Sequence, residues 1–231
     1  MSFINMLTEN SFTLVASLPE NNLELAKAAI DGGAQAIKVH INVWHRASGH
    51  TFGSFSDNRP FLESLIGLCG HIPVGLVCGG EDAFISEQEL RQLEQIGLGF
   101  YSSYVNHLPP FMLRTEGITK MVAINDRYTA DIVTGLELLG VDVLEGSIQP
   151  GDEYGRPLST EDLIRYRNLA GLSNLPLLIP TQKIIEPEQV GDLYRVGAKA
   201  IMIGAIVMGQ KPAADQVRQA CEEYRNAIER L

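Results

Sequence analysis

The sequence predicts a single (β/α)8 barrel, the TIM-barrel fold, with eight parallel strands over residues 1–231. Short apolar runs rich in β-branched residues alternate with amphipathic segments along the whole chain. Strict alternation of strands and helices favours parallel pairing with right-handed crossovers. A chain of 231 residues fits eight such units, and no linker rich in proline, glycine or serine divides it. We therefore expect one domain.

Each expected strand is a short apolar run with a helical segment after it. In chain order the strands are 12–18, 36–42, 73–79, 99–105, 120–126, 141–148, 176–182 and 200–206. Amphipathic segments such as 22–30 and 159–170 are expected helices. Ser159, with Asp162 three residues later, indicates a helix start, and a further helix is expected near Pro187.

A weak repeat gives the even-numbered strands a common phase. Four segments read helix, glycine, strand, with the glycines at Gly33, Gly97, Gly140 and Gly197. Aligned on these glycines, the strands carry first Lys38, Ser102, Glu145 and Met202, then His40, Tyr104, Ser147 and Gly204, then Asn42, Asn106, Gln149 and Ile206. Alternate strands fill a barrel interior in layers of four side chains, so each set is expected to form one layer. The apolar neighbours should face the helices; they are Ile37, Val39, Leu144, Ile201 and Ile203.

Four residues are candidates for catalysis. Lys38 and Glu145 would share a layer on opposite strands. A desolvated amine can act as a base or form a Schiff base, and a carboxylate across the substrate can exchange protons with it. A buried structural ion pair is the alternative. His40, one layer nearer the mouth, is a candidate acid or base, and Asp126 is a candidate acid, base or helix cap.

The ends of the last two strands are expected to form a phosphate site. In this fold, the loops after strands seven and eight often bind phosphate together with a helix N-terminus. A glycine there lets backbone amides approach an anion. The candidate residues are Thr181, Gln182, Lys183, Gly204 and Ala205. A glycine that only relieves crowding at the barrel rim is the alternative.

The segment 42–61 after the second strand is long for a βα loop. Long loops in compact domains are commonly functional, so we interpret it as a lid or substrate loop. A self-packed surface loop is the alternative. The candidate substrate ligands are Asn42, Arg46, His50 and Ser147.

The segment 187–205, PEQVGDLYRVGAKAIMIGA, resembles the phosphate-binding (β/α)8 barrels, the ribulose-phosphate-binding-like superfamily. Many members carry a glycine pair after strand seven, where this chain has IPTQK at 179–183, so Thr181 and Gln182 would replace it. The resemblance implies isomerases, epimerases, decarboxylases or synthases of phosphorylated metabolites, without specifying one family.

The composition of the chain excludes several classes of binding partner. The net charge of −10, without a run of Lys or Arg, argues against nucleic acids and anionic membrane surfaces. The three cysteines form no CxxC, no segment reads as a signal peptide, and no apolar run reaches the ~18 residues of a membrane helix. We therefore expect a cytoplasmic protein without disulfides or structural zinc.

Together these features predict an enzyme that transfers protons next to a carbonyl of a small phosphorylated metabolite. An isomerase, an epimerase or an aldolase-type lyase fits. The alternatives are a non-catalytic phosphometabolite-binding or regulatory barrel and a flavin-binding barrel. No cofactor and no metal site are predicted, with flavin, or a divalent metal on Glu145 and Asp126, left open. A homo-oligomer is compatible with the sequence.

Overall fold

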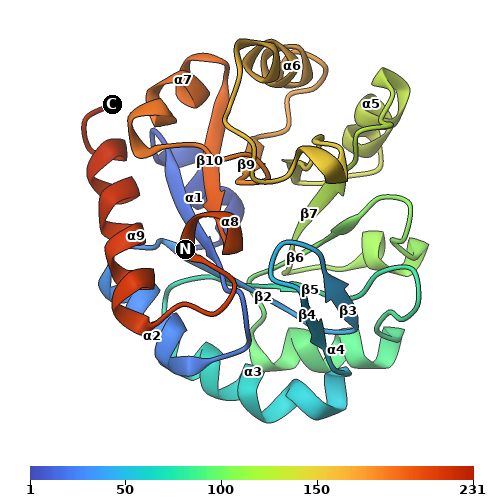
Figure 1. Ribbon diagram of the computed structural model, residues 1–231. Helices are drawn as coiled ribbons and strands as arrows, with labels where there is room; N and C mark the ends of the chain where they lie inside the picture. The colour runs from blue at the N-terminus through green and yellow to red at the C-terminus, as the bar shows by residue number, and fades with distance from the viewer.

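The computed structural model describes residues 1–231 and contains a closed barrel of eight parallel strands (Figure 1). The strands are β1 (Thr13–Ser17), β2 (Ala36–His40), β5 (Val74–Val77), β6 (Phe100–Tyr104), β7 (Thr119–Ile124), β8 (Val143–Gly146), β9 (Leu177–Pro180) and β10 (Ala198–Ile203). Around the barrel they follow the order β1-β10-β9-β8-β7-β6-β5-β2. All eight strands expected from the sequence are present, and the predicted fold class is confirmed.

Helices cover the outside of the barrel (Figure 1). They are α2 (Leu23–Asp31), α3 (Phe55–Cys69), α4 (Glu87–Ile96), α5 (Ala130–Leu138), α6 (Thr160–Ala170), α7 (Val190–Arg195) and α9 (Ala214–Ile228), with short 3-10 turns η1 (Pro110–Arg114), η2 (Gly151–Glu153) and η3 (Pro187–Gln189). Ser159 caps α6 and forms the expected capping box with Asp162. The connection from β6 to β7 holds only η1, where a full helix was expected. None of the helices has the length and apolar composition needed to cross a bilayer.

The repeated glycines have the backbone conformation that the alignment implied. Gly33, Gly97, Gly140 and Gly197 have φ values of 93°, 91°, 76° and 99°. A positive φ is costly for other residues and is typical of a helix end. Because each turn has the same geometry, the four strands that follow enter the barrel in the same phase.

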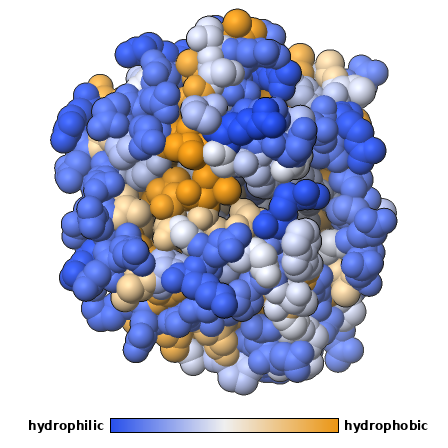
Figure 2. All heavy atoms as spheres, viewed as in Figure 1, coloured by the Kyte–Doolittle hydropathy of each residue, from blue (hydrophilic) through white to orange (hydrophobic).

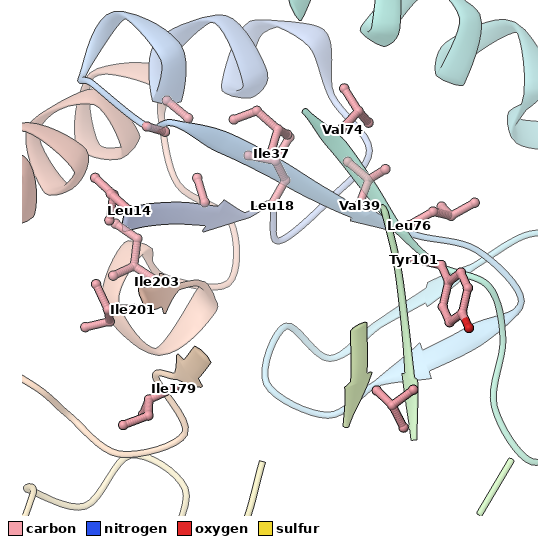
Figure 3. Packing of buried hydrophobic residues seen from close by; sticks show 14 of the residues in the cluster. Leu14, Leu18, Ile37, Val39, Val74, Leu76, Tyr101, Ile179, Ile201 and Ile203 are labelled. Carbon is pink, nitrogen blue, oxygen red and sulfur yellow. The ribbon is translucent and has the colours of Figure 1, made fainter. Parts of the chain in front are cut away.

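The apolar side chains of the strands belong to two hydrophobic clusters, one outside and one inside the barrel. Ile37, Val39, Leu144, Ile201 and Ile203 belong to the larger cluster between strands and helices, as expected (Figure 3 labels several of them). The inner cluster lies within the barrel and contains Val15, Ala36, Phe100, Met121, Val143, Leu178, Ala200 and Met202. Its position below the polar layers gives the barrel an apolar floor.

Helix α1 (Phe3–Glu9), which was not predicted from the sequence, joins this floor. Phe3 and Leu7 are fully buried in the inner cluster, and the Phe3 ring stacks on Phe100 with centroids 4.0 Å apart. The apolar stacking anchors the N-terminal segment against the barrel interior. We therefore expect the functional site at the opposite, carboxyl-terminal end of the strands.

The expected long loop after β2 is an ordered hairpin. Strands β3 (Val43–His45) and β4 (His50–Phe52) pair antiparallel, and α3 already begins at Phe55. The prediction of a loop over 42–61 is therefore corrected at its end, where residues 55–61 are helical. The hairpin follows β2 and lies beside the carboxyl-terminal end of β5, where the Asn42 side chain bonds the Cys78 carbonyl (Figure 1).

Gly75→Ala tests the packing of the barrel floor. A Cβ at Gly75 would overlap the ring of Phe100, which Phe3 holds in place. We expect the substitution to lower the free energy of unfolding by roughly 1–3 kcal/mol, as overpacking does. Urea denaturation measures the change.

Gly135→Ala is the matched control, because its Cβ would meet no atom within 4 Å and the residue lies inside α5. It should leave stability unchanged or raise it by about 0.5–1 kcal/mol. Equal effects of the two substitutions would contradict the tight contact at Gly75.

Candidate active site

A cavity of about 770 Å³ opens at the carboxyl-terminal end of the barrel. Most of the predicted site residues line it: Lys38, His40, Asn42, Arg46, Asp126, Glu145, Ser147, Thr181, Gln182, Gly204 and Ala205. His50 and Lys183 are not among the lining residues. Figure 2 shows the molecule from the side of the β3–β4 hairpin and of α8 (Ala205–Met208), with a group of hydrophobic residues in a mainly hydrophilic surface.

A buried ion pair lies at the bottom of the cavity. Nζ of Lys38 is 3.5 Å from Oε2 of Glu145, and both side chains are 6% exposed. Ser102 donates a hydrogen bond to Oε2 at 2.5 Å, and Ser147 donates one to Oε1 at 2.8 Å. Lys38, Ser102 and Glu145 thus form the layer that the glycine alignment predicted.

The two members of this pair differ in how fully their hydrogen bonds are used. Both carboxylate oxygens of Glu145 accept hydrogen bonds, as a buried charge requires. The amine of Lys38 has three donors and contacts only Glu145 among protein acceptors. The remaining donors of Lys38 are therefore available to a molecule in the cavity.

His40 lies one layer nearer the mouth and stacks under the hairpin. Its side chain is 1% exposed, and neither ring nitrogen has a hydrogen-bond partner. The ring centroid is 4.4 Å from that of His45 and 4.9 Å from that of Phe52. A buried polar ring without partners is unusual in a native interior. His40 lines the cavity, and both of its nitrogens are buried without a partner in the protein.

Burial keeps both stacked imidazoles neutral. It holds the pKa of His40 well below the ordinary value, and the nearby charges of His45 and Lys38 lower that pKa further. Burial and Lys38 also lower the pKa of His45 to about 4, with Glu145 acting in the opposite direction. At neutral pH the two rings therefore carry no charge, and His40 is poorly suited to donate a proton as an imidazolium.

The predicted phosphate residues are only partly free. The amide of Gly204 donates to Oγ1 of Thr181 at 3.2 Å, and the amide of Thr181 donates to the Met202 carbonyl. The side chain of Gln182 bonds the amide of Gln149 and the hydroxyl of Tyr154. These groups connect neighbouring loops.

Lys183 does not reach the cavity. Its amine is 2.5 Å from Glu153 and 3.7 Å from Asp162, so it ties the loop after β8 and helix α6 to the end of β9. At the phosphate position, Gly204 and Ala205 line the cavity, and Ala205 is the first residue of α8.

The remaining candidate residues differ in their exposure and in their contacts. Asn42 has a φ of 54°, and its side chain bonds the Cys78 carbonyl at 3.2 Å, which fixes the start of the hairpin. His50 packs its ring 5.6 Å from Phe52 on the hairpin. Asp126 is exposed at the rim. Arg46 lines the cavity and has no carboxylate partner.

Several site residues were not selected from the sequence. Ser102 and Tyr104 stood in the aligned layers, but their roles depend on contacts that only folding creates. Tyr104 lines the cavity, and burial together with Tyr154 and Glu145 raises the pKa of its hydroxyl well above the ordinary value. His45, which the sequence offered as a possible clamp for a substrate anion together with Arg46 and His50, lies in the hairpin, whose pairing no local pattern had indicated. No group of three His, Cys, Asp or Glu side chains is arranged to hold a metal ion, so Glu145 and Asp126 have no third ligand of these types.

The pKa shifts predict a pH dependence of stability. The unfolded chain binds protons at His40 and His45 near pH 6.5, whereas the folded chain resists protonation until about pH 4 at His45. Because the unfolded state binds more protons in this interval, the free energy of unfolding should fall as the pH drops from about 7 to about 4.5.

His40→Phe preserves an aromatic ring in the stack and removes its titration, so the fall should become shallower. Urea denaturation across this range measures the slopes, and the ring nitrogen shifts in NMR report the protonation states directly. A titration midpoint near pH 6.5 for either ring would contradict the proposed burial.

No protein-family model matches the sequence, and no curated protein is significantly similar to it. Solved structures do match. Thiamine phosphate pyrophosphorylase from Pyrococcus furiosus superposes with a TM-score of 0.67 at 16% identity, covering 96% of this chain and 98% of that chain. KGPDC from Streptococcus mutans gives a TM-score of 0.70 at 13% identity, covering 96% of this chain and 99% of that chain.

The tryptophan synthase A-subunit from Pyrococcus furiosus gives a TM-score of 0.68 at 12% identity, covering 94% of this chain and 98% of that chain. These neighbours share the barrel fold that the sequence predicted. At such low identity the likeness establishes architecture alone: the chain is a (β/α)8 barrel that shares its fold with these proteins over nearly its whole length.

Proposed function

We propose that this protein is an enzyme that moves a proton next to a carbonyl group of a small phosphorylated metabolite. The observation that carries the proposal is the Lys38–Glu145 pair at the bottom of an open cavity. Buried ionisable groups with unused hydrogen-bonding capacity are frequent in active sites. The carboxyl-terminal end of the strands is also where this fold performs chemistry.

The geometry supports an acid–base route. The free donors of the Lys38 ammonium would bond the substrate carbonyl oxygen and stabilise the negative charge that develops on it. Glu145, oriented by Ser102 and Ser147, would take the proton from the adjacent carbon and return it to the neighbouring one. Together with transfer of the hydroxyl proton on the first carbon to the former carbonyl oxygen, these steps are an isomerisation. Return of the proton to the opposite face of the same carbon would be an epimerisation.

The same pair also supports a lyase route. Lys38 would first pass a proton to Glu145, after which the neutral amine would attack the substrate carbonyl. Loss of water from the resulting carbinolamine gives a Schiff base, which accepts electrons when the neighbouring carbon–carbon bond breaks. The separation of 3.5 Å between Nζ and Oε2 is within reach of such a transfer.

The phosphate would bind at the end of β10. Gly204 and Ala205 line the cavity at the start of α8, and Thr181 holds the amide of Gly204 in place. Backbone amides at a helix start favour an anion through their partial positive charge. One of the structural neighbours is named for a thiamine phosphate activity, which favours a phosphorylated substrate here.

Borohydride trapping of Lys38 separates the two routes. The protein is incubated with phosphorylated aldehydes, ketones and 2-keto acids, reduced with sodium borohydride and mapped by mass spectrometry. A substrate-derived mass at Lys38 supports the lyase route, and its absence together with deuterium uptake from D2O supports the isomerase route. Lys38→Met should lower either activity by at least about a hundredfold.

Lys120→Met is the control, because Lys120 is a partly buried lysine near Asp142 that does not line the cavity. It should retain activity. The double variant Lys38→Met with Glu145→Gln leaves no unpaired charge in the interior. Its circular dichroism spectrum should match that of the wild-type protein while its activity is lost, which separates loss of activity from loss of fold. A wild-type protein that binds the phosphorylated compounds and changes none of them would instead indicate a non-catalytic binding barrel.

Glu145→Gln tests the base. Glutamine preserves the shape of the side chain but cannot take a proton, so deuterium exchange into a bound substrate should fall by about a hundredfold or more. NMR of the substrate in D2O measures the exchange. Unchanged exchange in this variant would remove Glu145 from the mechanism while leaving the phosphate site untouched.

A further inference from the structure

The β3–β4 hairpin carries a guanidinium group across the mouth of the cavity. Arg46 follows β3, the hairpin strand that comes directly after β2, yet its side chain lies against Gly151 in the loop after β8. A Cβ added at Gly151 would lie only 2.6 Å from Nη1 of Arg46. Because β2 and β8 are on opposite sides of the barrel, Arg46 spans the mouth above the Lys38–Glu145 pair.

This guanidinium has no protein counter-charge. The chain has 28 acidic residues, but none forms an ion pair or a hydrogen bond with Arg46. Seven of the other eleven arginines pair with a carboxylate three or four residues away. A free arginine that lines a cavity is a frequent binding group for carboxylates and phosphates.

A second, independent observation lies beneath the hairpin. His40 is almost completely buried, lines the same cavity, and has two ring nitrogens without partners. The ring of His45, the neighbour of Arg46 in the chain, stacks on it at 4.4 Å. A buried nitrogen of this kind leaves a hydrogen bond unmade until a ligand supplies its partner.

We propose that Arg46 and His40 bind a carboxylate, so that the substrate carries a carboxylate at one end and a phosphate at the other. This inference rests on the proposed function and names the substrate class for the same site. One guanidinium and one neutral imidazole supply a single positive charge, which matches the single negative charge of a carboxylate better than a phosphate dianion. The reacting carbonyl then lies between the two ends, above Lys38.

Two small probes with the same carbon skeleton test this inference. 3-Phosphoglycerate carries a carboxylate where glycerol 3-phosphate carries a hydroxymethyl group. Isothermal titration calorimetry should show that the wild-type protein binds 3-phosphoglycerate about tenfold more tightly. Arg46→Gln should reduce the preference to less than about twofold without weakening the binding of glycerol 3-phosphate.

Arg127→Gln is the matched control, since Arg127 is an exposed arginine that also lines the cavity. It should keep the preference. Trp44, the only tryptophan in the chain, lies two residues from Arg46, so its emission should respond to 3-phosphoglycerate and not to glycerol 3-phosphate.

Three results would overturn the carboxylate site: equal affinities of the two probes for the wild-type protein, a preference that survives in Arg46→Gln, or the same loss in Arg127→Gln. In each case, continued binding of glycerol 3-phosphate leaves the phosphate site and the proposed function intact. Absence of binding for both probes would count against the phosphate site as well.

Discussion

The buried pair of Lys38 and Glu145 constrains both the strand register and the chemistry of this barrel. Removing two charges from water costs several kcal/mol for each ion, so the remaining hydrogen-bonding positions must be filled. Ser102 and Ser147 fill them for the carboxylate. A slip of one residue in β2 or β8 would turn one charge toward the apolar helices. The arrangement that lets the barrel fold is therefore the one that places an amine and a carboxylate in one cavity.

The barrel interior is divided along its axis. Below the ion pair, Phe100 fills the space opposite Gly75, and Phe3 of α1 closes the stack. Above it, the side chains become polar and the cavity opens. An apolar floor lowers the local dielectric and strengthens the electrostatic interactions above it. Packing at one end of the strands thus supports the chemistry at the other, as is general for this fold.

How far the sequence predicts this molecule depends on the range of the contacts involved. The eight strands and the shared layer of Lys38 and Glu145 follow from periodicity and from four equivalent glycines, which are local signals. Helix α1 and the hairpin carry no comparable repeat and were not predicted. Lys183 was selected for its place at the end of the seventh strand, and the ion pairs of its amine with Glu153 and Asp162 join residues too distant in sequence to predict. Thr181 and Gln182 likewise donate hydrogen bonds to Met202 and Tyr154, partners that are distant in the sequence.

Two continuous segments approach the site from opposite sides. Strand β2 and its hairpin provide Lys38, His40 and Arg46, while β8 and its loop provide Glu145, Ser147 and Gly151. Near the barrel floor the two segments meet through the buried ion pair. At the rim they meet through the contact of Arg46 with Gly151, and an exposed hydrogen bond from Gln210 to Ala47 holds the hairpin tip.

Exposed contacts of this kind contribute little to stability, so the rim can adapt to a ligand while the floor stays in place. Changes in the hairpin would then alter which substrate end is accepted without displacing the Lys38–Glu145 pair, to which we assign the proton transfer. Because the hairpin follows His40 directly in the chain, a ligand that bonds His40 also bears on the position of Arg46. Strand β2 therefore connects recognition at the mouth with the ion pair below it.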